Sequence, residues 1–122
     1  MITSFLDLEV YQKSLQLSYD IEELIRKFPK QEQFLLVDQM RRASRSIPAL
    51  IAEGYAKKDS LKTFQKYLRD AVGETNGMIA HLQQSTQFGH IKPESQGVEL
   101  IHQYDQLGKK LTNLKDNWQN FK

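Results

Sequence analysis

Apolar side chains recur at alternating steps of four and three residues along four successive segments of the chain. The first series runs from Val10 to Phe28, the second from Leu36 to Gly54, the third from Phe64 to Leu82 and the fourth from Leu100 to Phe121. Steps of this size put every member of a series on one face of an α-helix, whereas a half-buried strand would alternate at every second residue. The spacing therefore predicts an all-α chain of four amphipathic helices.

Residues that commonly begin or end helices stand between the four series. Pro29 is expected to end the first helix, Asp59 or Ser60 to cap the third, Gly89 to end it, and Pro93 to occupy the first turn of the fourth. The helices should each span about 20 to 27 residues, and the connections between them are short. Helices of matched length with short connections favour an antiparallel, up-down-up-down four-helix bundle. We expect this bundle to form one domain over residues 1–122.

Pro48 falls inside the second series, where it removes an amide hydrogen and crowds the carbonyl of Ser44. The apolar spacing runs through the proline in register, which favours a kinked but continuous helix. Ser44 or Ser46 could offer the freed backbone a local hydrogen bond, and packing on both sides must offset a cost of about 3 kcal/mol. The alternative is two short helices that meet at a corner over residues 46–48.

The composition bears on location and on redox chemistry. The chain contains no cysteine, so it has no disulfide framework, no thiolate nucleophile and no sulfur ligand for a metal. Asp7 and Glu9 stand where a signal peptide would be apolar, and no apolar run approaches the roughly eighteen residues that span a bilayer. We therefore expect a cytoplasmic protein without membrane contact.

Known catalytic and metal-binding patterns are incomplete in this chain. A carboxylate-bridged di-iron bundle needs two Glu-x-x-His pairs, and only Glu99 and His102 form one. There is no Gly-x-Ser-x-Gly elbow and no glycine-rich phosphate loop. Gly73 and Gly77, four residues apart, are better explained by the close approach of a neighbouring helix. We expect no catalytic residues, no metal, no cofactor and no small-molecule substrate.

Charge is distributed unevenly along the chain. Residues 26–69 carry eleven basic and four acidic side chains, whereas residues 1–25 carry one basic and five acidic side chains. A basic segment can bind nucleic acid because lysine and arginine displace the counterions of the phosphates. Alternatively, the basic segment faces the acidic first helix or serves solubility. The basic surface that we nominate for phosphate contact consists of Arg41, Arg45, Lys57, Lys58, Lys62, Lys66 and Arg69.

Four polar residues of the second helix fall on one side of it, and we call them the polar seam: Gln39, Arg42, Ser46 and Glu53. Charged groups are costly to bury without partners, so the seam either faces solvent or meets polar groups across an interface. Arg42 and Glu53 are about 16 Å apart along a helix, too far to pair with each other. We assign the polar seam to assembly.

Several strings of the sequence resemble one protein family. The most specific is Gln39-Met40-Arg41-Arg42-Ala43-x-x-Ser46-Ile47-Pro48-Ala49-x-Ile51-Ala52-Glu53-Gly54. The opening Phe5-x-Asp7-Leu8-x-Val10-Tyr11-Gln12-Lys13, the pair Phe28-Pro29, and the later Lys62-x-Phe64 and Ala71-x-Gly73 also match. Over nearly its whole length, from Phe5 to about Leu111, the chain resembles the four-helix-bundle proteins of the 23S rRNA intervening-sequence family.

This resemblance implies an antiparallel four-helix bundle that assembles into a ring, typically a homopentamer, with no established enzymatic activity. Some relatives are encoded inside insertions in large-subunit ribosomal RNA genes. A structurally similar basic pentamer assists the reverse transcriptase of diversity-generating retroelements. These associations imply RNA or a nucleoprotein as partner, and a protein-interaction scaffold without nucleic acid is the alternative.

The chain departs from the family pattern at three positions. Leu50 replaces a usual asparagine, Glu74 a frequent serine, and Gly77 a typical glutamate. If those polar groups form a shared site in the family, that site is weakened in this chain.

Overall fold

The structure, a computed structural model, describes residues 1–122 and contains no strand. Four α-helices account for most of the chain: α1 (Glu9–Ile25), α2 (Leu36–Ala56), α3 (Leu61–Gln87) and α4 (Glu94–Asp116). Three single turns of 3-10 helix flank them: η1 (Phe5–Asp7), η2 (Lys30–Glu32) and η3 (Trp118–Asn120). The all-α class and the four helices that the sequence predicts are confirmed. No helix is both long and apolar enough to cross a bilayer.

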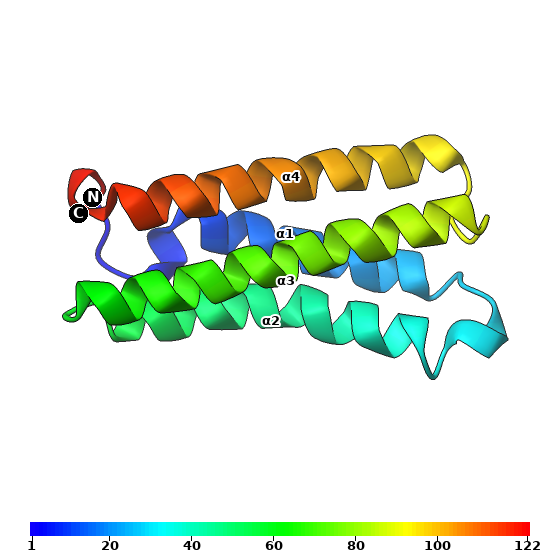
Figure 1. The fold of residues 1–122 in the computed structure, drawn as a ribbon, viewed down its shortest axis with the longest axis horizontal. Coiled ribbons are helices and arrows are strands. Elements are labelled where there is room, and N and C mark those ends of the chain that lie inside the picture. Colours follow the sequence, from blue (N-terminus) through cyan, green and yellow to red (C-terminus); the bar gives the residue numbers. More distant parts are fainter.

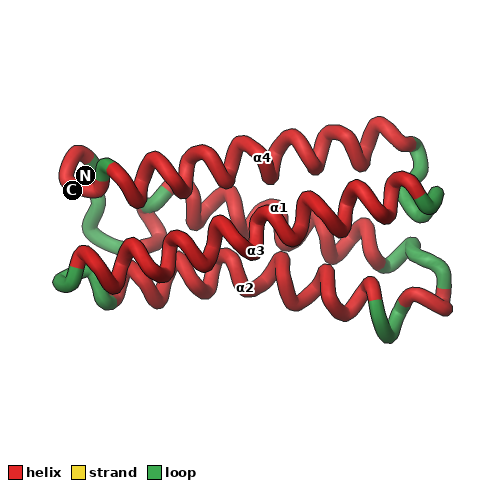
Figure 2. Tube along the Cα trace, in the orientation of Figure 1, coloured by secondary structure: helices red, strands yellow, loops and turns green.

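The four helices lie side by side along the long axis of the molecule (Figure 1). The connections α1–α2 and α3–α4 lie at one end, and the α2–α3 connection lies at the other end with both chain termini. Each helix packs against two others, α1 and α3 against both α2 and α4. The connecting segments are short beside the helices that they join (Figure 2).

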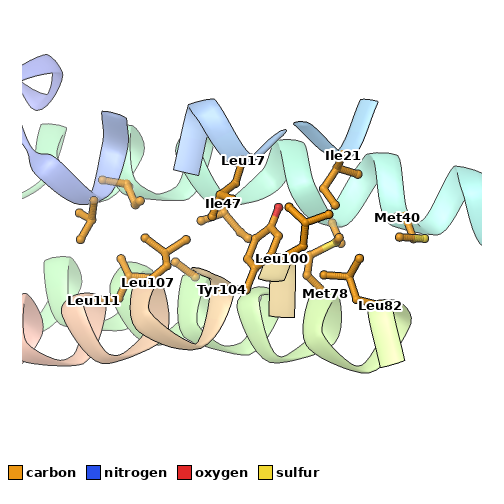
Figure 3. Packing of buried hydrophobic residues seen from close by; sticks show 14 of the residues in the cluster. Leu17, Ile21, Met40, Ile47, Met78, Leu82, Leu100, Tyr104, Leu107 and Leu111 are labelled. Atoms are coloured by element: carbon orange, nitrogen blue, oxygen red, sulfur yellow. The ribbon is translucent and has the colours of Figure 1, made fainter. Parts of the chain in front are cut away.

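The predicted apolar faces meet in one continuous core of 26 buried side chains. Leu17 and Ile21 of α1, Ile47 of α2 and Met78 of α3 have no exposed surface, and Leu107 of α4 is 1% exposed. Figure 3 shows these side chains filling the space between the helices. Burial of apolar surface contributes roughly 25 cal/mol per Å², so this core is the main source of stability.

Helix ends follow the predicted signals closely at α3 and α4. The Ser60 hydroxyl accepts a hydrogen bond from the Thr63 amide, which caps α3. Gly89 follows α3 with a φ of 80°, a left-handed conformation in which a Cβ would be strained. Pro93 is the N-cap of α4, one residue earlier than the expected first turn, and Glu94 begins the helix.

Helices α1 and α4 end earlier than the sequence predicts. Helix α1 has 17 residues and ends at Ile25, before the predicted end, although Phe28 beyond it is still buried. Helix α4 stops at Asp116, and Trp118 reaches the core from η3. Periodicity predicts which side chains are buried, but an apolar residue in a turn can occupy the same core position.

Pro48 lies inside α2, which continues through it from Leu36 to Ala56. The alternative of two short helices with a corner over residues 46–48 is therefore wrong. The Ser44 hydroxyl donates to the Arg41 carbonyl at 3.1 Å and that of Ser46 lies 2.8 Å from the Ala43 carbonyl oxygen. Neither hydroxyl bonds the Ser44 carbonyl that the proline deprives of a donor.

Buried polar side chains mostly bond within their own helix. The hydroxyls of Ser14, Ser44, Thr75 and Ser85 each donate to a backbone carbonyl three or four residues earlier. The Tyr104 hydroxyl is the exception, since it is the one buried side-chain oxygen or nitrogen without a hydrogen-bond partner. Its ring extends from α4 across the core, with the oxygen near Leu17 and Ile47 in the view of Figure 3.

Candidate nucleic-acid and assembly surfaces

Arg41 and Arg45 of α2 reach back to α1, where both bind Glu22. The Arg41 guanidinium donates two hydrogen bonds to the two carboxylate oxygens at 3.1 Å each, and Arg45 donates one at 3.1 Å. The hydrogen bond from Arg41, together with the two positive charges, holds the pKa of Glu22 below its ordinary value. Part of the basic segment therefore faces the acidic first helix, as the alternative interpretation of the charge pattern expected.

Lys57, at the C-terminal end of α2, and Lys66 of α3 lie around a tyrosine of α3. The Lys57 ammonium donates to the Tyr67 hydroxyl at 2.6 Å, and this bond raises the pKa of Lys57. Lys66 pairs with Asp70 one turn later at 2.9 Å, and its ammonium lies 5.7 Å from the centre of the Tyr67 ring. Both lysines remain exposed, so these contacts orient the ammonium groups without removing them from water.

Lys62 and Arg69 of α3 form no ion pair and no side-chain hydrogen bond. Lys58, in the α2–α3 connection, contacts only an aromatic face, with its ammonium 4.2 Å from the centre of the Tyr55 ring. All three are exposed. The fully available cations of the basic surface are therefore these three residues.

The structure divides the seven residues of the basic surface into two groups. Arg41 and Arg45 bind α1, whereas Lys57 contacts α3, so the two groups meet different neighbours of α2. The remaining lysines and Arg69 belong to the end of the bundle where α2 meets α3 (Figure 1). The sequence placed these residues in one segment but gave no sign of the division, because helix α2 turns its two flanks to different neighbours.

The polar seam faces outward along α2. Gln39, Arg42 and Glu53 are exposed, and Arg42 pairs at 3.2 Å with Asp38 of its own helix. The Ser46 hydroxyl lies 3.1 Å from a carboxylate oxygen of Glu74 on α3, to which it can donate. Glu74 is one of the three departures from the family pattern, and its contact with the seam was not predicted because it joins residues 28 positions apart.

Glycines on α2 and α3 have opposite environments. A Cβ added to Gly54 of α2 would lie 2.7 Å from the Tyr67 Cβ, so this glycine permits close contact between α2 and α3. A Cβ added to Gly73 or Gly77 of α3 would meet no atom within 4 Å. Gly73 and Gly77 face open space, so the predicted close approach of a neighbouring helix does not occur at them within this bundle.

Groups for metal chemistry are not gathered anywhere in the molecule. No cluster of three or more histidine, aspartate or glutamate side chains could hold a metal ion. Glu99 and His102, the single di-iron-like pair, are both exposed on α4. His90 lies in the α3–α4 connection, 3.9 Å from Glu32.

Most of the chain matches the model of one protein family. The model of the 23S rRNA-intervening sequence protein family matches residues 6–113. The chain belongs to this family. The match includes all of α1, α2 and α3 and most of α4, and it contains both the polar seam and the basic surface. The comparison with curated proteins finds no match.

Proposed function

We propose that this protein is a non-catalytic, oligomeric four-helix bundle that binds RNA, or a partner carrying RNA, through the basic end where α2 meets α3. The observation that carries the proposal is the set of unpaired cations Lys58, Lys62 and Arg69 at that end. Unpaired surface cations are available for phosphates without first breaking an ion pair. Lys57 and Lys66 would add to the positive electrostatic potential at the same end of the bundle.

The architecture that we infer for the protein is an up-down-up-down bundle with α2 bent at Pro48. By family resemblance it assembles into a ring, which we take to be a homopentamer, and we expect it in the cytoplasm. A ring would repeat the basic end around one axis, so that a modest local charge on each chain becomes a strong positive field.

Binding of RNA is tested by a salt series with paired charge-removing variants. Each lost contact to a single strand should reduce the slope of log affinity against log salt by about 0.7. Lys62→Gln with Arg69→Gln should therefore lower the magnitude of the slope by about 1.4 and weaken binding at low salt. The matched control removes two exposed lysines at the opposite end, Lys30→Gln with Lys92→Gln.

The control variant should retain the affinity and the slope of the unmodified protein. Absence of binding at low salt, or binding that does not respond to salt, would refute the RNA proposal. Equal losses of RNA affinity in the two double variants would show that only the total charge matters. The RNA-binding surface could then not be assigned to the α2–α3 end.

The outward face of α2 and α3 supports the assembly part of the proposal. The polar seam presents charged and amide groups along α2, and Gly73 and Gly77 leave space beside it on α3. A glycine inside a helix costs about 1 kcal/mol relative to alanine, and no contact within this chain explains that cost. Close approach of a second chain to this face would explain it.

Assembly through this face is tested by Gly77→Leu, which fills the open space. The variant should stay helical by circular dichroism and lose the oligomer in sedimentation. Gln106→Leu introduces the same side chain at an exposed position of α4 and should keep the oligomer. If Gly77→Leu leaves the mass unchanged, the face formed by the polar seam and these glycines is not the interface.

A protein-interaction scaffold without nucleic acid is the second candidate. It is favoured by the Glu22 contacts, which neutralise two of the seven residues in the basic surface. Lys62→Glu with Lys66→Glu separates the candidates. Loss of RNA binding with the oligomer intact supports the first, and loss of the oligomer supports the second.

A further inference from the structure

The α2–α3 end of the bundle contains a small hollow beside the chain termini. Its volume is about 280 Å³, and its walls are formed by Ile2, Tyr55, Lys58, Asp59, Trp118 and Lys122. Three elements meet there, the end of α2, the α2–α3 connection and η3. The hollow lies at the basic end and shares Lys58 with the basic surface, whereas its other wall residues do not belong to that surface.

Two packed aromatic rings line the base of the hollow. Tyr55 is 9% exposed and Trp118 is 5% exposed, and their rings meet edge to face with centroids 6.1 Å apart. Phe64 of α3 supports Trp118 from the core, in a second edge-to-face contact at 5.0 Å. The aromatic base is therefore held in place by the fold and does not have to rearrange to receive a ligand.

Lys58 and Lys122 supply the cations of the hollow. Neither forms an ion pair with a carboxylate, and the Lys58 ammonium is oriented by its position over the Tyr55 ring. The one acid among the walls is Asp59, which also forms no ion pair. A second hollow of about 330 Å³, near the N-terminus of α1, differs because its lysine, Lys110, already pairs with Glu9.

The shape and chemistry of the hollow restrict its ligand. Small-molecule sites usually span roughly 300 to 1,000 Å³, and this hollow of about 280 Å³ lies just below that range, so it suits one ring system and not an extended ligand. Aromatic edges and an aliphatic side chain accommodate a planar ring, and the two ammonium groups accommodate an anion beside it. One nucleotide unit combines these two features.

We infer that this hollow binds a single nucleotide unit, with the base against Tyr55 and Trp118 and the phosphate between Lys58 and Lys122. The inference rests on the proposed function for its choice of a nucleotide among anions that carry a ring. It deepens that function, because it assigns the basic end two roles. Lys62 and Arg69 attract the phosphate backbone, and the hollow holds one nucleotide of the strand.

Trp118 is the only tryptophan of the chain, so its fluorescence reports directly on the hollow. The probes are adenosine monophosphate, adenosine and inorganic phosphate. Adenosine monophosphate should change the emission of Trp118 in a saturable manner, and either fragment alone should bind more weakly. Lys58→Gln should weaken the nucleotide about five- to tenfold, as expected for loss of one charge-assisted contact. Lys92→Gln, at the opposite end, should have no effect.

A second arm uses a short RNA in place of the free nucleotide. RNA should cause the same Trp118 change, and Lys58→Gln should reduce that change while leaving most of the salt-dependent affinity. Salt-dependent RNA binding without any Trp118 response to RNA or nucleotide would overturn the inference and leave the proposed function intact. A Trp118 response to the nucleotide but no binding of RNA would support the hollow as a site for free nucleotides and refute the proposed function. An equal response in Lys58→Gln and the unmodified protein would also overturn the inference.

Discussion

Tyr104 offers the sharpest test of how the core is assembled. Its side chain has no exposed surface, and its hydroxyl has no hydrogen-bond partner. An unsatisfied buried polar group costs roughly 1 to 3 kcal/mol. Tyr104→Phe removes only the hydroxyl and keeps the ring, which is buried in the core (Figure 3), so the cavity left behind is small. We expect the free energy of unfolding to rise by about 1 kcal/mol.

The measurement is urea unfolding followed by circular dichroism at constant protein concentration. The midpoint should rise with an unchanged slope, and the melting temperature should rise by about 3 to 5 °C for a chain of this size. Tyr19→Phe is the matched control, because Tyr19 is 62% exposed and should change stability little. A loss of stability in Tyr104→Phe would refute the reasoning, since it would mean that the hydroxyl has a stabilising partner.

The same residue predicts a change at high pH. Burial raises the pKa of Tyr104 well above that of an exposed tyrosine. The folded chain therefore keeps the proton after the unfolded chain begins to lose it near pH 10, so stability from this group is present below about pH 10 and falls as the pH rises further. The unmodified protein should lose stability above that pH more steeply than Tyr104→Phe.

Three further substitutions, one of them with a matched control, test other contacts. Gly54→Ala should destabilise the protein by about 1 to 3 kcal/mol because its Cβ would press on Tyr67, whereas Gly108→Ala on α4, where a Cβ meets only ordinary contact at 3.6 Å, should be neutral or stabilising in thermal unfolding. Ser60→Ala should cost about 1 kcal/mol in the same assay, and no loss would contradict its capping role. Because the pKa of Glu22 is lowered in the folded chain, the ionised carboxylate stabilises the fold above its unfolded pKa near 4.5, and this stability is lost as the pH falls through the folded pKa. Glu22→Gln should therefore make stability depend less on pH between about pH 5 and 3. An unchanged acid unfolding profile would contradict the contribution of this group.

The periodic core and the local caps could be predicted from the sequence because their signals are local. Leu17, Ile21 and Ile47 follow helical spacing and are fully buried, and Ser60 stands at the predicted start of α3. Phe34 belongs to the same class of side chain but is 93% exposed, because it precedes α2 in a turn. Spacing alone does not tell whether a flanking apolar residue belongs to the helix.

The candidate site was only partly predictable because its contacts join residues far apart in sequence. The basic side chains are evident from composition, but the binding of Arg41 and Arg45 to Glu22 depends on which flank of α2 faces α1. Likewise, Gly73 and Gly77 are spaced as if a helix packed against them, but both face open space within this chain. These distinctions follow from the packing of whole helices, which no local pattern encodes.

The mass of the protein in solution tests most directly whether the bundle assembles. Sedimentation equilibrium at micromolar concentration and physiological salt should give about five times the 14.2 kDa of one chain. A single species of 14.2 kDa under those conditions would contradict the assembly.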